Sequence, residues 1–302
     1  MIAVLITSLL LFLSYALLII YYRQGWAGIP NYKTQTANQE LKTTVTVIIP
    51  ARNEALNIGA CLDSISEQTY PKELFEVIVV DDHSTDNTAA VIDAYTSQNI
   101  KRIALKDFVS SPLNSYKKKA IEVGIQHATG KLIITTDADC TVPPNWLQTL
   151  VSFYETHHPV FIAAPVSINC SNNFTEIFQA LDFMTLQGIT GASVHKKFHN
   201  MCNGANLAYE KAAFHEVDGF AGIDDIASGD DMLLMHKIYK RYPGQVMFLR
   251  SKEAIVQTAP VKTVTQFFNQ RIRWASKADK YDDKRMMPVL LLVYFFNLSF
   301  LL

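Results

Sequence analysis

The chain has 302 residues, of which 27 are Lys or Arg and 28 are Asp or Glu, so charged residues make up 18% and the formal net charge is −1. An ordinary soluble domain carries about 25% charged residues, and two charge-free ends, residues 1–22 and 286–302, account for roughly half of the shortfall. This composition excludes a disordered chain, a collagen-like chain, a disulfide scaffold and a polytopic transporter. The charge balance also predicts no nucleic-acid partner.

The first charge-free end, residues 1–22, is long enough to cross a bilayer as a helix, since about 20 apolar residues suffice. Arg23 and nearby aromatic residues follow it, whereas a signal peptide would have a basic start and small residues at a cleavage site. The alternative is a buried core helix. Basic residues flank both apolar ends on the inner side, which predicts a protein of the cell (inner or plasma) membrane with residues 23–285 in the cytoplasm.

The second charge-free end, residues 286–302, is short for a span and stops at the last residue. We therefore expect a transmembrane helix that is cut short, with further membrane segments beyond Leu302. The four cysteines, at positions 61, 140, 170 and 202, show no CxxC pair, which favours reduced cytosolic thiols over disulfides or zinc ligands.

Between these ends, short Val- and Ile-rich runs alternate with segments of helical period. The predicted strands are 45–50, 75–80, 102–105, 131–136 and 160–166, and the predicted helices are 57–68, 86–98, 117–128 and 145–156. This repeated unit predicts an α/β domain with a mainly parallel sheet and helices on both faces. Ligands of such sheets bind outside the carboxyl ends of the strands, so the functional residues should follow the strands.

Acidic residues do follow three of the predicted strands. Glu54 comes after the first strand, Asp81 and Asp82 after the second, and Asp137 and Asp139 close the fourth. Two carboxylates two residues apart can hold a hard divalent cation that also takes phosphate oxygens. The alternative is that such residues, Asp86 above all, only cap the following helices.

Phosphate would have to be held without a glycine-rich loop, because the first strand is followed by the glycine-free sequence PARNEA and no P-loop is present. Lys117 and Lys118, at the start of the helix before the acidic strand, are candidates for this role. The alternative is a solvated basic face.

Two later segments carry further candidates. Asp230 and Asp231 precede an apolar helix, whose dipole favours an ionised carboxylate at its start, and such a group could accept the proton of an attacking hydroxyl; a helix cap is the alternative. In the segment 265–281, Gln270, Arg273 and Trp274 share one helical face, whereas Arg271 should point elsewhere. This helix could also lie on the bilayer surface as a plain amphipathic segment.

Taken in order, PARNE, VVDDHSTDNT, YKKKA, TTDADC, CNGAN, SGDD and QRIRW resemble the motifs of membrane-bound, inverting family 2 glycosyltransferases. That family includes cellulose-, chitin- and hyaluronan-synthase-like enzymes and ceramide glucosyltransferases. The resemblance covers about residues 44–302 and implies a GT-A fold, a Rossmann-like nucleotide-sugar domain. The implied domains are a transmembrane helix (1–22), a linker (23–43), the GT-A domain (44–262), an interfacial helix with QxxRW (263–285) and a truncated transmembrane helix (286–302).

The resemblance also implies a role for each matching residue. Ala51 and Glu54 would contact the donor base, Asp82 or Asp81 would accept the uracil imide proton, and Lys117 would lie near the diphosphate. Asp137 would bind the ribose or the metal side, Asp139 would ligate Mg²⁺ or Mn²⁺, and Asp231 would be the general base. Gln270, Arg273 and Trp274 match QxxRW, in which arginine steadies the pyrophosphate and tryptophan lines the acceptor site.

Two positions depart from the family's pattern. Asp230 stands where the family commonly has Glu, which leaves the role of Asp230 open, and Lys119 replaces a residue that is often small. The expected function is inverting, metal-dependent transfer from a UDP-sugar to a hydroxyl of a membrane-associated lipid or glycan. The alternatives are a sugar-phosphate nucleotidyltransferase and a non-catalytic nucleotide-sugar-binding membrane protein.

Overall fold

The computed structural model describes residues 2–34, 41–95, 99–109, 113–226, 228–275 and 283–300. The helices are α1 (Ile2–Gly28), α2 (Ile58–Ser66), α3 (Thr88–Asp93), α4 (Tyr116–His127), α5 (Trp146–His157), α6 (Phe174–His195), α7 (Lys211–Glu216), α8 (Met232–Arg241), α9 (Val264–Ala275) and α10 (Met286–Leu298), with short 3₁₀ turns at Lys72–Leu74, Leu105–Asp107 and Lys252–Ala254. The strands are β1 (Val45–Ala51), β2 (Phe75–Asp81), β3 (Ile100–Ala104), β4 (Leu132–Thr135), β5 (Cys140–Thr141), β6 (Phe161–Ala163), β7 (Val166–Ile168), β8 (Leu207–Glu210), β9 (Val246–Phe248) and β10 (Val256–Thr258).

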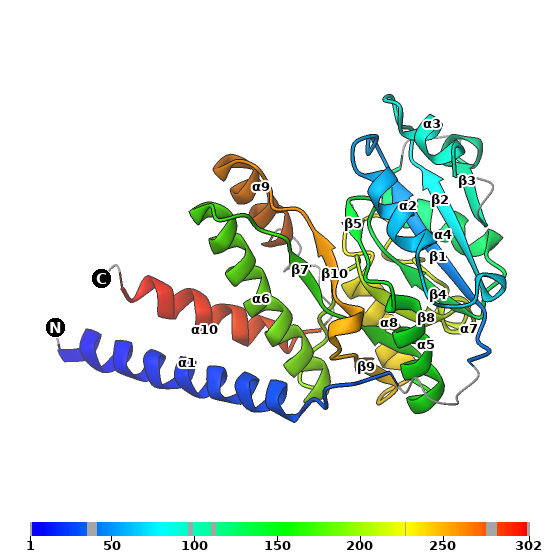
Figure 1. The fold of residues 1–302 in the computed structure, drawn as a ribbon. Helices are drawn as coiled ribbons and strands as arrows, with labels where there is room; N and C mark the ends of the chain where they lie inside the picture. Colours follow the sequence, from blue (N-terminus) through cyan, green and yellow to red (C-terminus); the bar gives the residue numbers. More distant parts are fainter. Residues whose placement is uncertain are drawn as a thin grey trace.

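Seven strands form the central sheet in the order β3-β2-β1-β4-β8-β6-β9 (Figure 1). Only β8 runs against its neighbours β4 and β6, so the predicted mainly parallel sheet is confirmed. The register pairs Ala51 with Asp81 at the ends of β1 and β2. The loops after these two strands therefore leave the sheet at the same level, and the neighbouring β4 ends slightly earlier, with Thr135 opposite Ile48.

Both faces of the sheet are covered because β1 is apolar on both sides. Val45, Val47 and Ile49 point into a core with α2 and α5, whereas Ile48 points into a second core with α4. Helix α4 packs so closely on this second face that a side chain at Gly124 would come within 2.7 Å of Ile48. This tight contact fixes the height of α4, whose first turn carries Lys117 and Lys118.

The structure departs from the sequence prediction at two places. The single strand predicted over 160–166 is divided at Ala164 and Pro165 into β6, in the central sheet, and β7, in a small sheet ordered β5-β10-β7. The 22-residue helix α6 follows this small sheet and was not predicted. It matters for function because it lies between the central sheet and the apolar helices α1 and α10 in the view of Figure 1, and α9 lies beside its amino-terminal end.

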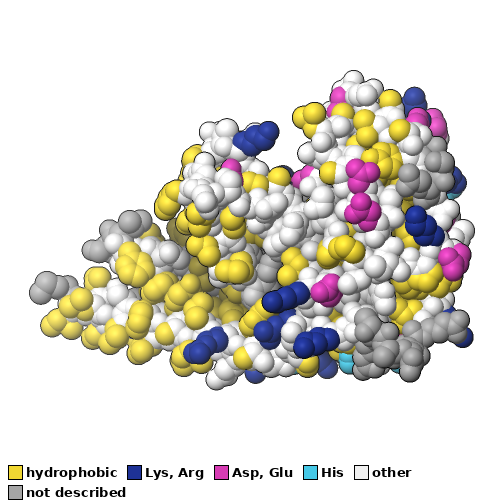
Figure 2. Space-filling view, in the orientation of Figure 1, with side chains coloured by type: hydrophobic (Ala, Val, Ile, Leu, Met, Phe, Trp, Pro, Cys, Tyr) yellow, Lys and Arg dark blue, Asp and Glu magenta, His cyan; other side chains and the backbone are white. Residues whose placement is uncertain are grey.

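Helix α1 runs to Gly28, beyond the predicted end at Tyr22, and within the described residues it alone is long and apolar enough to cross a membrane. The apolar helix α10 is shorter. The two lie side by side, with the rings of Tyr15 and Phe296 stacked 4.3 Å apart, and both project to the left of the sheet domain in Figure 1. Figure 2 shows that hydrophobic side chains dominate the surface of this projection, whereas charged side chains gather on the rest of the molecule.

Helix α1 is packed into the fold at its carboxyl end. It crosses α6 at small residues: a side chain at Gly25 would come within 2.9 Å of Ala192, and one at Gly191 would come equally close to Trp26. The Arg250 guanidinium lies 4.8 Å above the Trp26 ring and donates to the carbonyl groups of Trp26 and Ile29. The end of α1 is therefore fixed both to α6 and to the segment after β9.

Candidate active site

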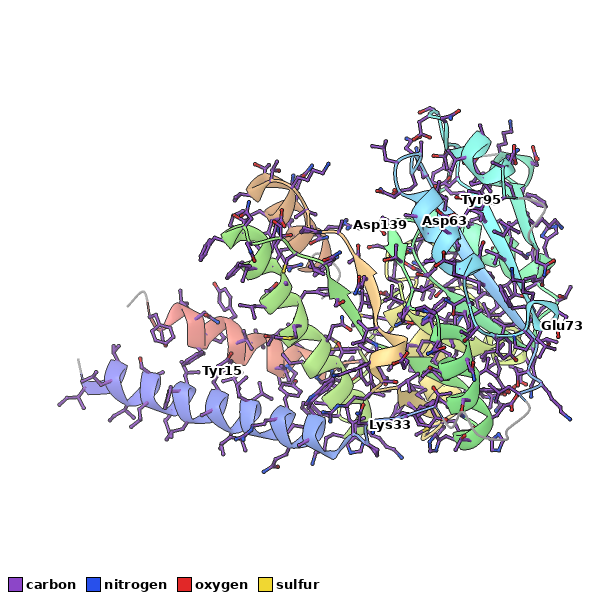
Figure 3. All side chains as sticks on the ribbon, viewed as in Figure 1. Tyr15, Lys33, Asp63, Glu73, Tyr95 and Asp139 are labelled. Carbon is purple, nitrogen blue, oxygen red and sulfur yellow. The ribbon has the colours of Figure 1, made fainter. Side chains whose placement is uncertain are left out.

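A cavity of about 250 Å³ opens at the carboxyl ends of β1, β2 and β4, as the parallel sheet predicts. Its walls are formed by Pro50, Ala51, Arg52, Glu54, Asp82, Lys117, Asp137, Ala138 and Asp139. Six of these residues are candidates from the sequence. In the view of Figure 3, Asp139 lies at the edge of the sheet domain nearest to α9, and Figure 2 shows the surface hollowed between these two parts.

The loops after β1 and β2 are joined by hydrogen bonds. The amide of Glu54 donates to Thr88 Oγ1 at 2.8 Å, and that of Ala55 donates to an oxygen of Asp86 at 3.1 Å. The Asn53 side chain, on a residue with φ of 56°, accepts from the amide of Thr85. Asp86 also accepts from the amide of Thr88 at the start of α3, so it does cap this helix, and in addition it ties the two loops together.

The two acids after β2 face different surroundings. Asp82 lines the cavity, whereas Asp81, the last residue of the strand, accepts from the amide of Ser84 and lies 3.9 Å from the Arg102 guanidinium. Adjacent residues of a strand point to opposite sides, which explains the difference. Of these two acids, Asp82 is the one that lines the cavity.

Three side chains that the sequence analysis did not single out surround Asp82. Arg52 approaches one carboxylate oxygen at 3.6 Å, and His83 Nδ1 lies 2.9 Å from the other. Arg52 also lies 5.7 Å from the centroid of the Tyr116 ring, which packs edge-on against His83. All three belong to motifs of the sequence, Arg52 to PARNE, His83 to VVDDHSTDNT and Tyr116 to YKKKA, although none of them was singled out.

Lys117 connects the acids of the cavity to the later acidic pair. Its ammonium lies 2.7 Å from Asp137 Oδ1 and 3.4 Å from Asp230 Oδ2. Burial opposes the charged form, but these two carboxylates outweigh it and raise the pKa of Lys117. Lys117 is therefore a fixed positive charge at the rear of the cavity.

The remaining carboxyl groups of the cavity are short of positive charge. Burial and then the Asp137 carboxylate raise the pKa of Asp139, although its side chain stays open to the cavity mouth. Burial raises the pKa of Glu54 as well, and the carboxylates of Asp139 and Asp137 add to the effect. A cation bound here would relieve this repulsion.

The donor set fits a metal that is shared with a ligand. No group of three or more His, Cys, Asp or Glu side chains in the described part of the chain is arranged to hold an ion alone. Asp137 and Asp139 offer carboxylate oxygens on one turn, and Mg²⁺ is commonly held by one or two carboxylates together with substrate phosphates. The cysteines beside this turn, Cys61 and Cys140, are free and buried thiols, as expected from their spacing.

Asp231 begins α8, as the sequence predicts for a carboxylate at a helix start. Its Oδ1 accepts from the amide of Met232 at 2.7 Å, and its Oδ2 accepts from the amide of Gly204 at 3.1 Å. The first contact is the cap that was the alternative interpretation, and the second ties Asp231 to the loop CNGAN. A side chain at Gly204 would lie 3.2 Å from Asp230, a tight contact, and 3.5 Å from Lys117, so the loop runs close to both residues.

Lys118 does not reach the cavity, so its candidate role in phosphate binding is wrong. Its ammonium donates instead to the carbonyl groups of Ile223, Ile226 and Ser228. Neighbouring residues of a helix point about 100° apart, which turns Lys118 inward when Lys117 faces the acids.

The residues of QxxRW lie on α9, outside the walls of the cavity. Trp274 packs against Phe183 of α6, and Arg273 is exposed. The expectation that Arg271 points elsewhere is wrong: it donates to Gln270 Oε1, lies 4.3 Å above the Trp274 ring and forms an ion pair with Asp182 of α6. The length of the arginine side chain lets it reach these partners on both sides.

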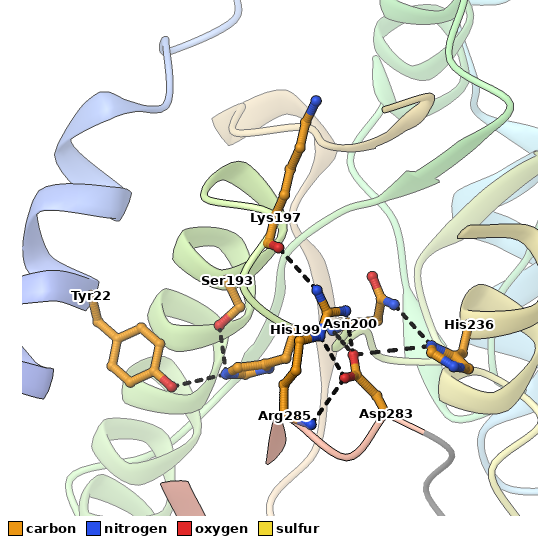
Figure 4. A network of polar contacts seen from close by, with 8 residues as sticks. All are labelled: Tyr22, Ser193, Lys197, His199, Asn200, His236, Asp283 and Arg285. Carbon is orange, nitrogen blue, oxygen red and sulfur yellow. Dashed lines mark hydrogen bonds and ion pairs between the residues drawn. The ribbon is translucent and has the colours of Figure 1, made fainter. Parts of the chain in front are cut away.

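A polar network joins the start of α10 to the loop before Gly204 (Figure 4). Asp283 accepts from the amide of Asn200 and pairs with Arg285, and the Asn200 side chain lies 3.1 Å from His236 Nδ1 on α8. The preceding residue, His199, is hydrogen-bonded to Tyr22 of α1 at 2.8 Å. Helices α1, α8 and α10 are thus all connected to the loop that contacts Asp231. The remaining basic residues expected before α10, Lys277 and Lys280, lie outside the described residues.

The sequence profile of the family described as Glycosyl transferase family 2 matches residues 46–217. The chain belongs to glycosyltransferase family 2. Among its relatives, the glycosyltransferase AglE of Haloferax volcanii is 29% identical over 189 residues, which make up 62% of this chain and 59% of AglE. The chain therefore spans less than two thirds of the length of this relative.

Solved structures of the same fold agree with the GT-A expectation for this family 2 member. The mannosyltransferase PcManGT from Pyrobaculum calidifontis, in complex with GDP-Man and Mn²⁺, superimposes with a TM-score of 0.67 at 21% identity, over 96% of this chain and 80% of that one. TarS 1–349 of S. aureus, in complex with UDP-GlcNAc, superimposes with a TM-score of 0.54 at 20% identity, over 73% of this chain and 59% of that one. At these identities the likeness shows the fold alone.

Proposed function

We propose that the protein transfers a sugar from a UDP-sugar to a hydroxyl of a membrane-associated lipid or glycan, with a divalent metal and with inversion at the anomeric carbon. The observation that carries the proposal is the position of Lys117, which contacts Asp137 in the cavity and Asp230 beside Asp231. A leaving diphosphate and an attacking hydroxyl need such neighbouring sites, one cationic and one acidic.

On the donor side, the nucleobase occupies the part of the cavity bounded by Ala51, Glu54 and Asp82. Asp82 is held between Arg52 and His83, which fixes the direction of its carboxylate toward the base. Lys117 neutralises the diphosphate as the sugar leaves it. The TarS complex with UDP-GlcNAc supports a uridine donor, whereas the PcManGT complex with GDP-Man makes guanosine donors the comparison to test.

The metal would be held by Asp139, with Asp137 beside it, and completed by phosphate oxygens of the donor. When bound, a Mg²⁺ or Mn²⁺ ion supplies Lewis-acid stabilisation of the diphosphate. The raised pKa of Asp139 supports this assignment, because the crowded carboxylates favour any ligand that adds positive charge.

On the acceptor side, Asp231 is the general base. Its carboxylate is oriented by the amides of Met232 and Gly204, and it lies next to Asp230 and Lys117 at the edge of the donor site. It removes the proton of the acceptor hydroxyl as this attacks the anomeric carbon. Because the attack is a single displacement, the configuration inverts.

The acceptor reaches the site from a membrane. The helices α6 and α9, which border the hollow in Figure 2, expose apolar side chains: Phe174, Phe178, Leu181 and Met184 on α6, and Val264, Phe268 and Ile272 on α9. Such faces suit the interface of a bilayer. The proposed location is the cell membrane, with α9 as an interfacial helix that brings Gln270, Arg273 and Trp274 to the acceptor, and with the sheet domain in the cytoplasm.

Asp231→Asn tests the assignment, because asparagine keeps the shape of the side chain and can accept one of the two amide hydrogen bonds, but cannot take a proton. With the purified full chain in lipid nanodiscs, radiolabelled nucleotide sugars and membrane extract as acceptor, loss of a general base should reduce kcat by about 10²–10⁴-fold while UDP binding is kept. Asp107→Asn, at an exposed carboxylate after β3, is the control. Undiminished transfer by Asp231→Asn contradicts the proposal, and so does pyrophosphate release from UTP and a sugar 1-phosphate without any sugar transfer.

A further inference from the structure

Lys118 is one of the most deeply buried side chains of the protein, with 2% of its surface exposed. Its ammonium lies 2.6 Å from the carbonyl oxygen of Ile223, 2.6 Å from that of Ile226 and 3.0 Å from that of Ser228. A lysine ammonium has three N–H donors, so these three carbonyl groups can use all of them. Lys118 therefore gathers three backbone groups around one buried charge.

These carbonyl groups belong to the segment that leads directly to the acidic pair. Ser228 is followed by Gly229, whose φ of 82° turns the chain, and then by Asp230 and Asp231 at the start of α8. The ammonium thus holds the last residues before the proposed base. Since α4 is packed tightly on β1 at Gly124, the point of attachment is itself fixed.

An apolar side chain of similar length would fill this space without the cost of burying an ammonium group, which is large unless the charge is well paired or hydrogen-bonded. The positive charge of the Lys118 ammonium instead orients the three carbonyl groups that accept its hydrogen bonds. Lys117, the preceding residue on the same turn of α4, reaches Asp137 and Asp230 from the other side. One helical turn therefore contacts both the donor cavity and the segment that carries the base.

We infer that Lys118 is a positioning residue for transfer: it holds the carbonyl groups of Ile223, Ile226 and Ser228 so that Asp231 stands at the correct distance from a donor bound at Lys117 and Asp139. This inference rests on the proposed function, because it takes Asp231 as the base. Lys118 itself touches neither donor nor acceptor.

The test compares Lys118→Met, which keeps the length of the side chain without its charge, with two matched controls. Lys119→Met removes the neighbouring lysine, which pairs with Glu122 at the surface, and Lys237→Met removes a lysine that binds the carbonyl groups of Gly219 and Ala221, farther from the acids. A displacement of about 1 Å can cost about 10²-fold in rate, so Lys118→Met should lower kcat by about that factor and leave the KM for the donor within threefold. Both controls should keep kcat within twofold.

A second measurement separates positioning from general stability. If Lys118 acts through the base, then Lys118→Met should cost less than threefold in kcat when it is added to Asp231→Asn. The same loss in both backgrounds, or an unchanged kcat in Lys118→Met, overturns the inference. Where Lys118→Met does not fold, Lys118→Ala assayed with methylammonium replaces it: tenfold or greater recovery of kcat supports the inference, and no recovery contradicts it.

Hydrogen exchange keeps the inference distinct from the proposed function, because it needs no turnover. In Lys118→Met the amides of residues 229–232 should exchange at least tenfold faster than in the wild type, while those of β1 should not change. Unchanged exchange at 229–232 overturns the positioning role even if the wild type transfers sugar. A wild type that transfers no sugar, with Asp231→Asn unaltered, overturns the proposed function instead.

Discussion

The edge of the sheet at the carboxyl ends of β1, β2 and β4, here called the donor edge, and helix α9 both carry sequence motifs of the family. The two sets of motif residues differ in whether they line the cavity. The residues that follow β1, β2 and β4 meet in one cavity, whereas Gln270, Arg273 and Trp274 lie outside its walls, on a helix held to α6 by Arg271 and Trp274. The first set is placed by strand register, which the backbone dictates. The second depends on how helices outside the sheet are held, so its distance to the donor can change with a bound ligand or a bilayer.

The donor edge gives the largest expected effect. Asp139→Asn removes the proposed metal ligand, and since metal stabilisation of a leaving group amounts to several kcal/mol, kcat/KM should fall by about 10³-fold. In EDTA, the same variant should unfold at a higher temperature than the wild type, because burial and the Asp137 carboxylate raise the pKa of Asp139 and so disfavour its ionised form. Transfer assays with added Mn²⁺ and thermal unfolding in EDTA measure the two effects.

Glu73→Gln, at an exposed carboxylate on the opposite edge of the sheet domain in Figure 3, is the control for this variant. A fall in kcat/KM of less than tenfold for Asp139→Asn would mean that the donor edge works without this ligand.

Variants of α9 test whether its motif residues act on the donor although they lie outside the cavity. If α9 closes on the donor during transfer, Arg273→Ala loses a charge-assisted hydrogen bond to the diphosphate, and kcat/KM should fall by about 10–100-fold. Arg271→Ala, which breaks the ion pair with Asp182, should instead lower the unfolding temperature of the full chain more than Arg273→Ala does. Steady-state kinetics and thermal unfolding of both variants in nanodiscs separate the two roles, and equal kinetics would show that α9 does not close.

His199 tests the connection between the two regions. Burial lowers the pKa of His199 from 6.5 to about 4. Between these two pH values the unfolded chain binds a proton at this histidine and the folded protein does not. Stability is therefore lost as the pH falls, and this one group should account for about 2 kcal/mol between pH 7 and pH 5. His199→Gln can still meet Tyr22 and should remove that part of the loss. Unfolding of both proteins by denaturant at the two pH values measures it, and parallel losses would contradict a neutral, buried histidine.

The smallest effect concerns the bonds between the two donor loops. Thr88→Val keeps the shape of a fully buried side chain but leaves the amide of Glu54 without its acceptor, which should lower the free energy of unfolding by about 1–2 kcal/mol and raise the KM for the donor several-fold. Thr88→Ser, which keeps the hydroxyl, should restore both values. A normal donor KM in Thr88→Val would show that the loops do not depend on this bond.

Much of the fold could be predicted because the strands of the parallel half are continuous Val and Ile runs between helical segments. Helix α6 could not, since it contains glycines and buried polar residues such as Gln179 and Gln187, whose partners lie elsewhere in the chain. The break at Pro165 also depends on tertiary structure, because β7 leaves the central sheet to pair with β10.

In the site, too, some features could be predicted from the sequence and others depend on tertiary packing. The meeting of Glu54, Asp82 and Asp139 follows from the sheet topology alone. By contrast, the sequence cannot tell Lys117 from Lys118, because which of two adjacent lysines faces the acids depends on the rotation of α4 about its axis, set by packing at Gly124. Likewise, the reach of Arg271 to Asp182 joins residues far apart in the chain.

The crossing of α1 and α6 at Gly25 and Gly191 has a practical consequence. A helix that only anchored the domain to a membrane could be removed without exposing the core. Removal of α1, by contrast, would uncover Ala192 and Phe248, which lie against its last turns. Since its last turns pack against α6 and Arg250, α1 would also hold the cavity at a constant height above any bilayer that it spans. Acceptors would then be selected by how far their hydroxyl groups project from that bilayer, as well as by their chemistry.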